Sequence, residues 1–165
     1  HFVHLAMLTT LHFSVREATL PEDPLIAQHF YQLWLAHQLT PDSLNPDWLN
    51  ITLEFIADAR QHLSYQAFVA EVEGKVVGSA SCQLFAGLYP LVFNEQYRKF
   101  GYIWGVYVEP DYRNQGIAKH LTRCTTDYLK SIGCTQAVLN ASPLGKPVYT
   151  HLGFTEANEM RLDLV

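Results

Sequence analysis

The stretch that decides the fold reads YIWGVYVEPDYRNQGIA over residues 102–118, and it joins a strand pattern to a helix pattern. Residues 102–108 are β-branched, aromatic or glycine, which predicts a strand. Pro110 cannot donate a hydrogen bond to a sheet, so we expect the strand to end before it. Apolar residues then recur at helical spacing from Ile117 to Ile132, and Gly133 follows where a left-handed helix end costs least.

The loop between this strand and this helix is suited to an anion. The first turn of a helix carries amides without partners, and the helix dipole adds positive potential there. A loop that ends on Gly116 can turn several amides toward a phosphate or diphosphate, and Gly116 and Ala118 place no large side chain in the way. The whole chain is acidic, yet Asp127 is the one acid among the basic residues of this interval: Arg113, Lys119, His120, Arg123 and Lys130.

Residues 113–118, RNQGIA, resemble the acetyl-CoA diphosphate motif of the GNAT superfamily of N-acetyltransferases, Q/R-x-x-G-x-G/A. The strand that ends in VYVEP, the pair Tyr112-Arg113 and the amphipathic helix that follows make the resemblance more specific than the short motif alone. The resemblance implies a set of residues that bind acetyl-CoA: Val106, Tyr107, Val108, Arg113, Asn114, Gln115, Gly116, Ile117 and Ala118.

The resemblance also implies how this cofactor lies. Two parallel strands, here residues 102–108 and 135–140, splay apart at their carboxyl ends and admit the pantetheine arm. The arm then pairs with the backbone of Val106 and Val108 as an added strand would. A free amide, that of Val108, would stabilise the oxyanion that forms on the acetyl carbonyl.

A second signature lies near the end of the chain. Residues 148–154, VYTHLGF, are similar to the family's tyrosine four residues before Gly-Phe. The resemblance implies that the Tyr149 hydroxyl approaches the coenzyme sulfur and donates a proton to the departing thiolate, as a phenol with a pKa near 10 can do at neutral pH. The alternative for any tyrosine is a position in the core or at its rim without a catalytic role. Ser142, in the triplet NAS, resembles a polar residue at the strand end in a family variant, where it contacts the coenzyme.

The sequence does not identify the general base that would remove a proton from the acceptor amine. Residues 102–108 contain no acid, and Glu109, just past them, fits a solvated loop position. The other candidates from the sequence are Glu95, Tyr107, Asp111 and His151. Ordered water and orientation alone are a further alternative. The eight histidines show no metal-ligand spacing, so we expect no metal.

Composition bounds the class of protein. With 165 residues, 48% hydrophobic and 16% charged, we expect one globular domain over residues 1–165. The net charge of −5 argues against a nucleic-acid partner. Three sparse cysteines favour a reducing, cytoplasmic location, and no apolar run is long enough for a membrane span. The first methionine is Met7, so residues 1–11 are either a leader or an extended N-terminus.

The order of elements gives the fold class. Besides residues 102–108, strand patterns cover residues 12–19, 66–73, 75–85, 135–140 and 160–164. Helix patterns also cover residues 25–39, 46–62 and a short segment between Pro147 and Gly153. We expect an α/β fold with a mixed sheet of about six to seven strands flanked by about four helices, the acyl-CoA N-acyltransferase fold of the GNAT superfamily.

Two segments bear on the acceptor. Residues 86–100 are longer than a usual hairpin loop, so they are either an acceptor-site loop or a surface excursion without function. The aromatic residues Phe30, Trp34 and Trp48 either pack in the core, which the sequence favours, or wall an acceptor pocket.

The function predicted on these grounds is transfer of an acetyl group from acetyl-CoA to a primary amine of a small molecule or peptide, by direct attack. A homodimer is compatible with it. One alternative is a non-catalytic acyl-CoA-binding module that senses or regulates. Another is a different phosphate binder, although no Gly-Lys-Ser/Thr run follows Gly116, which disfavours a P-loop.

Overall fold

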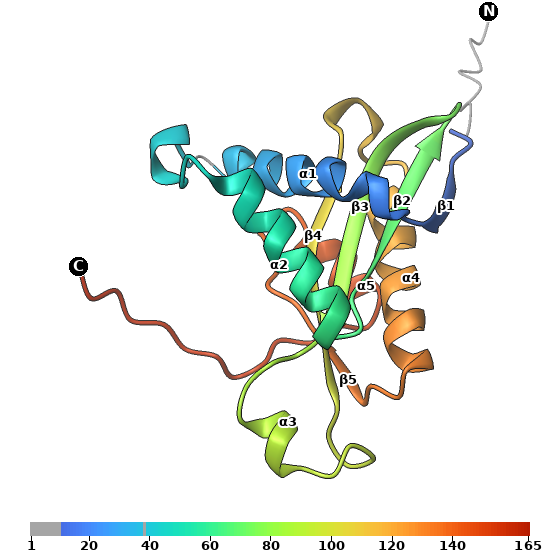
Figure 1. The fold of residues 1–165 in the computed structure, drawn as a ribbon. Coiled ribbons are helices and arrows are strands. Elements are labelled where there is room, and N and C mark those ends of the chain that lie inside the picture. Colours follow the sequence, from blue (N-terminus) through green and yellow to red (C-terminus); the bar gives the residue numbers. More distant parts are fainter. Residues whose placement is uncertain (1–10, 38) are drawn as a thin grey trace, which may run out of the picture.

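The computed structural model describes residues 11–37 and 39–165, and its centre is one mixed sheet (Figure 1). The strands lie in the sheet in the order of the chain: β1 (Ser14–Glu17), β2 (Gln66–Val72), β3 (Lys75–Leu84), β4 (Phe100–Val108) and β5 (Gln136–Val138). The first four strands pair antiparallel, whereas β4 and β5 are parallel. The expected α/β class is therefore confirmed. The prediction for residues 1–11 lies outside the described residues, Leu11 apart.

Helices cover both faces of this sheet (Figure 1). On one face α1 (Asp23–Ala36) and α2 (Trp48–His62) pack over a core of Ile26, Ile56, Ala59, Tyr65, Ala67 and Trp104. On the other, α4 (Ile117–Ser131) buries Ile117, Leu121 and Leu129 against the sheet, each at most 1% exposed. Neighbouring residues such as Ala67 and Phe68 belong to the two different cores, because successive strand side chains point to opposite faces. The helix predicted from Ile117 is confirmed, and Gly133 ends it with a φ of +89°.

The β2–β3 hairpin turns where the sequence predicts it. Glu73 and Gly74 have φ angles of +50° and +78°. Positive φ at both central residues is the backbone of the tight turn that matches the twist of paired strands. Val72 accordingly pairs with Lys75 directly across the turn.

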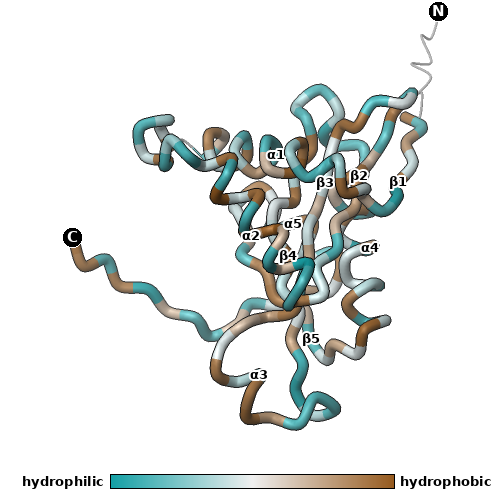
Figure 2. The backbone as a smooth tube through the Cα atoms, in the orientation of Figure 1, coloured by the Kyte–Doolittle hydropathy of each residue, from teal (hydrophilic) through white to brown (hydrophobic). Residues whose placement is uncertain are grey.

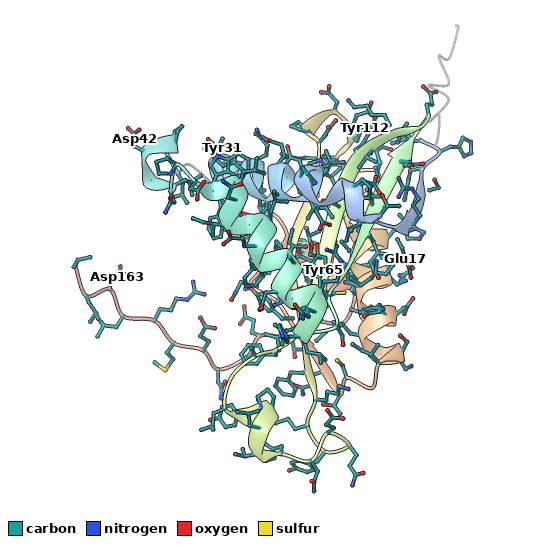
Figure 3. All side chains as sticks on the ribbon, in the orientation of Figure 1. Glu17, Tyr31, Asp42, Tyr65, Tyr112 and Asp163 are labelled. Atoms are coloured by element: carbon teal, nitrogen blue, oxygen red, sulfur yellow. The ribbon has the colours of Figure 1, made fainter. Side chains whose placement is uncertain are left out.

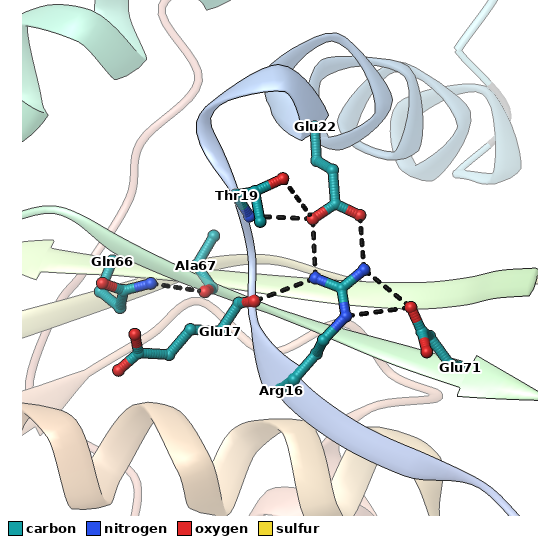
Figure 4. Close-up of polar contacts among 7 residues, drawn as sticks. All are labelled: Arg16, Glu17, Thr19, Glu22, Gln66, Ala67 and Glu71. Atoms are coloured by element: carbon teal, nitrogen blue, oxygen red, sulfur yellow. Dashed lines mark hydrogen bonds and ion pairs between the residues drawn. The ribbon is translucent and has the colours of Figure 1, made fainter. Parts of the chain in front are cut away.

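The edge of the sheet is tied to α1 by one arginine (Figure 4). Arg16 on β1 donates to both carboxylate oxygens of Glu22, over 2.8 and 2.9 Å, and to Glu71 on β2 over 2.7 and 2.9 Å. Glu22 also accepts the Thr19 amide over 2.8 Å. Since α1 begins at the next residue, Asp23, this network fixes where the helix starts relative to the sheet.

The strand predicted at residues 160–164 is wrong for this chain on its own. No helix or strand is assigned after α5 (Lys146–His151), and Met160, Leu162 and Leu164 are 93%, 82% and 87% exposed. In Figure 2 hydrophobic and hydrophilic bands alternate along this segment, and in Figure 3 its Asp163 lies away from the sheet. An alternating pattern forms a strand only beside an edge that supplies backbone partners. The described chain thus has five strands and five α-helices, counting the short α3 (Tyr89–Val92), rather than about six to seven strands and about four helices.

Candidate active site

The central strand β4 is interrupted by a bulge. Tyr107 pairs with Ser79 on β3 and Trp104 with Ser81, so Gly105 and Val106 together face the single residue between those serines. Gly105 has a φ of +64°, a conformation that a glycine adopts without strain. Bulges bend a strand and leave a residue unpaired, and they are common beside active sites. The bulge lies where the predicted cofactor-binding segment, Val106 to Val108, begins.

Beyond the bulge one edge of β4 is free. The parallel pairing with β5 covers only Phe100–Tyr102 against Gln136–Val138, so β5 is shorter than the predicted strand over residues 135–140. In the part of the chain that the structure describes, no strand pairs with residues 103–108 of β4 on that side. The two strands therefore diverge toward their carboxyl ends, as the resemblance implies. The exposed backbone edge can accept an extended ligand as an added strand.

The turn after β4 collects unpartnered amides. Asn114 and Gly116 both have positive φ, +62° and +84°, in the loop that leads to α4. The first helical hydrogen bond runs from the His120 amide to the Gly116 carbonyl over 3.1 Å. Within residues 11–37 and 39–165, the amides of residues 114–119 donate to no protein acceptor. Such a concave run of amides at a helix start binds anions.

The structure brings the predicted residues Asn114 to Ala118 together in this turn. The Ile117 side chain is 1% exposed and packs in the core, so its amide is the group it can offer a ligand. Nothing lies within 4 Å of a Cβ built on Gly116. The glycine is thus required by its backbone angle, and the open space beside it is available to a ligand.

Arg113 braces the turn against the strand. Its Nε donates to the Val108 carbonyl over 3.0 Å, and its guanidinium lies 5.8 Å from the centre of the Tyr107 ring. Figure 3 shows the adjacent Tyr112 at the carboxyl end of β4. Much of the hydrogen-bonding capacity of Arg113 stays free, because a guanidinium carries five N–H donors.

Tyr149 lies on α5, beyond the divergent strands. Its ring packs 5.9 Å from that of Phe154 and contacts the backbone near Gly145, where an added Cβ would lie 2.9 Å from the tyrosine ring. Burial raises the pKa of Tyr149 to about 12, so the phenol keeps its proton at neutral pH. The Ser142 hydroxyl accepts the Gly145 amide over 3.1 Å and so shapes the turn before α5.

The structure separates the candidates for the general base. Glu109 Oε2 lies 3.1 Å from Lys75 Nζ, so this carboxylate is held in an ion pair. The Glu95 side chain is 78% exposed, and Asp111 and His151 are exposed as well. Tyr107 differs from these, because it is only 8% exposed and packs against α1.

One buried residue beside Tyr107, His29, is not indicated by the sequence analysis. His29 on α1 is 3% exposed, its Nδ1 lies 2.7 Å from Ser79 Oγ, and its ring centre lies 5.0 Å from that of Tyr107. The signal was present in the helical spacing, since His29 stands three residues after buried Ile26 and shares its face. A single histidine on an apolar face gives no indication of its partners.

Some aromatic residues of α1 and α2 pack in the core, whereas others are exposed or line a hollow. Phe30 packs edge-on against Trp104, 5.1 Å between ring centres, as a core residue does. Trp34 is 40% exposed. Trp48 stacks on Tyr31 at 4.2 Å, and both line a hollow of about 330 Å³ with the segment around Asp42. Figure 3 labels Tyr31 and Asp42 toward the end of α1 and beyond it.

Residues 86–100 form an excursion that carries α3. Leu88, Leu91 and Val92 are 69%, 82% and 64% exposed, and the hydrophobic colour of Figure 2 is strong here. Arg98 is enclosed by three rings, with its guanidinium 3.8 Å from the Phe100 centroid, 4.6 Å from that of Tyr89 and 5.6 Å from that of Phe93. The excursion is therefore ordered by cation–π contacts, and its role in acceptor binding stays a prediction.

A parallel neighbour that diverges from β4 and an amide-lined turn at the next helix are what the resemblance to the acetyl-CoA-dependent N-acetyltransferases implies. The family follows from the chain itself. The model of the acetyltransferase (GNAT) family matches residues 25–154, so this chain belongs to that family, whose members transfer an acetyl group from acetyl-CoA to an amine.

Known proteins agree with this membership. The chain is 33% identical over 122 residues to the glucosamine 6-phosphate N-acetyltransferase of Trypanosoma brucei brucei, covering 72% of this chain and 80% of that protein. A predicted acetyltransferase of Clostridium acetobutylicum, solved with acetyl-CoA, has the same fold with a TM-score of 0.75 at 23% identity, over 93% of this chain and 97% of that one. An acetyltransferase of Trypanosoma brucei has a TM-score of 0.61 at 28% identity, over 93% and 100%.

Among residues 11–37 and 39–165, no helix combines the length and apolar character that crossing a bilayer requires.

Proposed function

We propose that this chain acetylates a primary amine of a small molecule or peptide, with acetyl-CoA as the donor. The observation that carries the proposal is the set of unpartnered amides at residues 114–119, placed directly beyond a strand whose edge is free. A diphosphate supplies the acceptors that these amides lack, and an extended amide-containing arm supplies partners for the strand edge.

The residues present fit this cofactor. Acetyl-CoA would supply the acetyl group as a thioester. Val106 and Val108, on either side of Tyr107, offer their backbone on the free edge of β4, and Ser142 stands at the start of the turn before α5. The diphosphate would be held by Arg113 and by the amides of the turn: Asn114, Gln115, Gly116, Ile117 and Ala118. An amide just beyond the bulge, that of Val108, is suited to stabilise charge on the acyl oxygen.

Direct attack by the amine is favoured over an acyl-enzyme on a cysteine. Burial raises the pKa of the Cys82 thiol to about 12 and also raises the pKa values of Cys124 and Cys134. A thiol held in its protonated form is a poor nucleophile. The acceptor nitrogen is thus left as the attacking group, once it has lost a proton.

Tyr149 is proposed as the group that faces the leaving sulfur. Since burial raises the pKa of Tyr149 to about 12, well above that of an ordinary thiol, its main action is a hydrogen bond to the developing thiolate rather than early loss of its proton. Tyr149→Phe should lower kcat by about 100-fold, with little change in KM for acetyl-CoA. Tyr97→Phe, at a tyrosine that is 75% exposed, is the matched control and should leave both constants unchanged. Equal kcat in Tyr149→Phe and the native protein would remove this role.

For the acceptor, the relative from Trypanosoma brucei brucei makes glucosamine 6-phosphate the first amine to test. The hollow beside Trp48 and Tyr31 is of a size for a small molecule, and Asp42 offers it a negative charge. Three free thiols, Cys82, Cys124 and Cys134, support a reducing, cytoplasmic location as part of this proposal.

We also propose a homodimer. The alternating apolar side chains of Met160, Leu162 and Leu164 are exposed, and β5 is an edge strand that has one neighbour in the described sheet. A second copy whose residues 160–164 pair along this edge would bury those side chains and supply the strand that the sequence predicts.

The test of the enzymatic proposal is turnover. Acetyl-CoA and a panel of amines, with glucosamine 6-phosphate, short peptides and polyamines included, should release free coenzyme A thiol with at least one acceptor. If acetyl-CoA raises the melting temperature while no amine supports turnover, the non-catalytic acyl-CoA-binding module is the better account. If ATP stabilises the protein more than acetyl-CoA does, the site belongs to another phosphate ligand.

A further inference from the structure

Three polar side chains in a row face α1 and α2 from β3. Ser79, Ser81 and Gln83 are 0%, 0% and 5% exposed. Each has one ring partner: His29 Nδ1 lies 2.7 Å from Ser79 Oγ, Tyr65 Oη lies 2.8 Å from Ser81 Oγ, and Trp104 Nε1 donates to Gln83 over 3.0 Å. These pairs satisfy the single polar atom of the tyrosine and of the indole. The imidazole has a second nitrogen.

That second nitrogen, His29 Nε2, is buried without a hydrogen-bond partner among the described residues. Leaving a buried donor or acceptor unpaired costs about 1–3 kcal/mol, and native proteins rarely keep one without a function. We therefore expect Nε2 to gain a hydrogen-bond partner, either a bound water molecule or a group that arrives during the reaction.

The place of His29 relates it to the acyl-transfer site. Its partner Ser79 pairs across the sheet with Tyr107, whose ring lies 5.0 Å from the imidazole. The next residue, Phe30, lies 3.7 Å from a Cβ built on Gly105. The imidazole thus lies beside Tyr107, the residue that follows the bulge of β4, and backbone groups left unpaired at the bulge can share a water molecule with Nε2.

We propose that His29 receives the proton that the acceptor ammonium must lose, through one water molecule held between Nε2 and the β4 bulge. This inference rests on the proposed acetyltransferase function. An N–H bond of the ammonium breaks and its electron pair stays on nitrogen. The proton passes to the water, which gives another proton to Nε2. The product is a neutral amine and an imidazolium whose Nδ1–H remains bonded to Ser79.

The charged and titratable groups around the imidazole are compatible with this step. From β4 it faces Tyr107, and beyond the strand it feels the negative charge of Glu109, which is paired with Lys75. Ser79 faces it from β3. Burial lowers the pKa of His29 from its ordinary 6.5, and Glu109 opposes that shift, so the imidazole is neutral and able to accept a proton at neutral pH.

The experiment compares His29→Asn with Tyr65→Phe under turnover. Asparagine can keep the bond to Ser79 while Nε2 is removed, and Tyr65→Phe deletes the neighbouring buried bond to Ser81 as the matched control. His29→Asn should lower kcat by about 100-fold and keep KM for acetyl-CoA and the melting shift that acetyl-CoA causes. The native rate should fall as pH drops through the pKa of His29, below 6.5, and this limb should be absent in His29→Asn. Tyr65→Phe should keep kcat and the limb.

An unchanged kcat in His29→Asn, or an acid limb that persists in it, overturns the inference while leaving the acetyltransferase assignment in place. Absence of turnover in the native protein with every amine overturns the assignment itself. A measurement on the native protein covers the case in which His29→Asn does not fold. Nitrogen-15 NMR of the histidines should show His29 at pH 7 as the Nδ1–H tautomer with Nε2 unprotonated. In the Nε2–H tautomer Nε2 cannot accept a proton, so finding that tautomer would overturn the proposal.

Discussion

At the scale of single residues, glycines with positive φ mark places where the backbone adopts a conformation that other residues rarely adopt. Gly116 and Gly74 have similar angles, +84° and +78°, and neither has an atom within 4 Å of an added Cβ. They differ in place, because Gly116 opens α4 at the amide cluster and Gly74 turns the β2–β3 hairpin. The two positions therefore separate the cost of the backbone angle from the effect on a ligand.

Gly116→Ala and Gly74→Ala should each lower the free energy of unfolding by about 1 kcal/mol, since a Cβ is strained at positive φ. Gly116→Ala should in addition weaken acetyl-CoA binding by at least about 10-fold, because its Cβ stands where the diphosphate approaches. Urea unfolding and calorimetry measure the two effects. If both variants bind acetyl-CoA equally well, the turn does not hold the diphosphate.

The single residues also show what a sequence can and cannot indicate. Gly116 and Tyr149 can be proposed as site residues from the sequence, because short motifs place them at fixed offsets from a strand or a glycine. His29 was not found, because its partner Ser79 is fifty positions away in the chain and meets it only when α1 packs on β3. Contacts of that kind depend on packing, which no local pattern encodes.

At the scale of elements, the start of α1 depends on the ion pairs of Arg16. The hydrogen bond from Arg16 lowers the pKa of Glu22 from 4.5 to about 2. A depressed folded-state pKa means that this stabilisation is complete above about pH 4.5 and is lost as pH falls toward about 2. Because the Arg16 side chain is 40% exposed, solvent screening reduces the contribution of the Arg16–Glu22 ion pair to the free energy of unfolding to about 1 kcal/mol.

Glu22→Gln should therefore be less stable than the native protein by about 1 kcal/mol at pH 7, and the difference should shrink between about pH 4.5 and 2.5. Urea unfolding over this range measures it. Glu159→Gln, an exposed carboxylate that pairs with Arg161 outside the sheet, is the control and should behave as the native protein. A difference that stays constant with pH would mean that the carboxylate charge of Glu22 does not act.

The elements themselves could largely be predicted, for a physical reason. Helices α2 and α4 and the β2–β3 hairpin are encoded locally, by apolar spacing and by the Glu73-Gly74 turn. The failures are at the sheet's far end. β5 is three residues long and residues 160–164 form no strand, since both depend on which backbone edge lies beside them rather than on their own pattern.

At the scale of the whole molecule, the extended C-terminal segment is the feature that a single chain does not explain. If residues 160–164 pair with a second copy, the protein should be a dimer by light scattering. Leu162→Asp should then shift it to monomer, because a charge cannot be buried at that contact. Asp163→Asn, on the opposite side of the same strand pattern, should leave the dimer intact. A native protein that is monomeric at high concentration would contradict the proposal.

The central claim is that the amides of residues 114–119 hold the diphosphate of acetyl-CoA and so place the thioester against β4. Calorimetry with acetyl-CoA and with acetyl-pantetheine, which keeps the thioester arm but lacks the diphosphate, tests it most directly. Acetyl-CoA should bind at least about 100-fold more tightly, a difference of about 2.7 kcal/mol. Equal affinity for the two compounds, or no heat with acetyl-CoA, would contradict it.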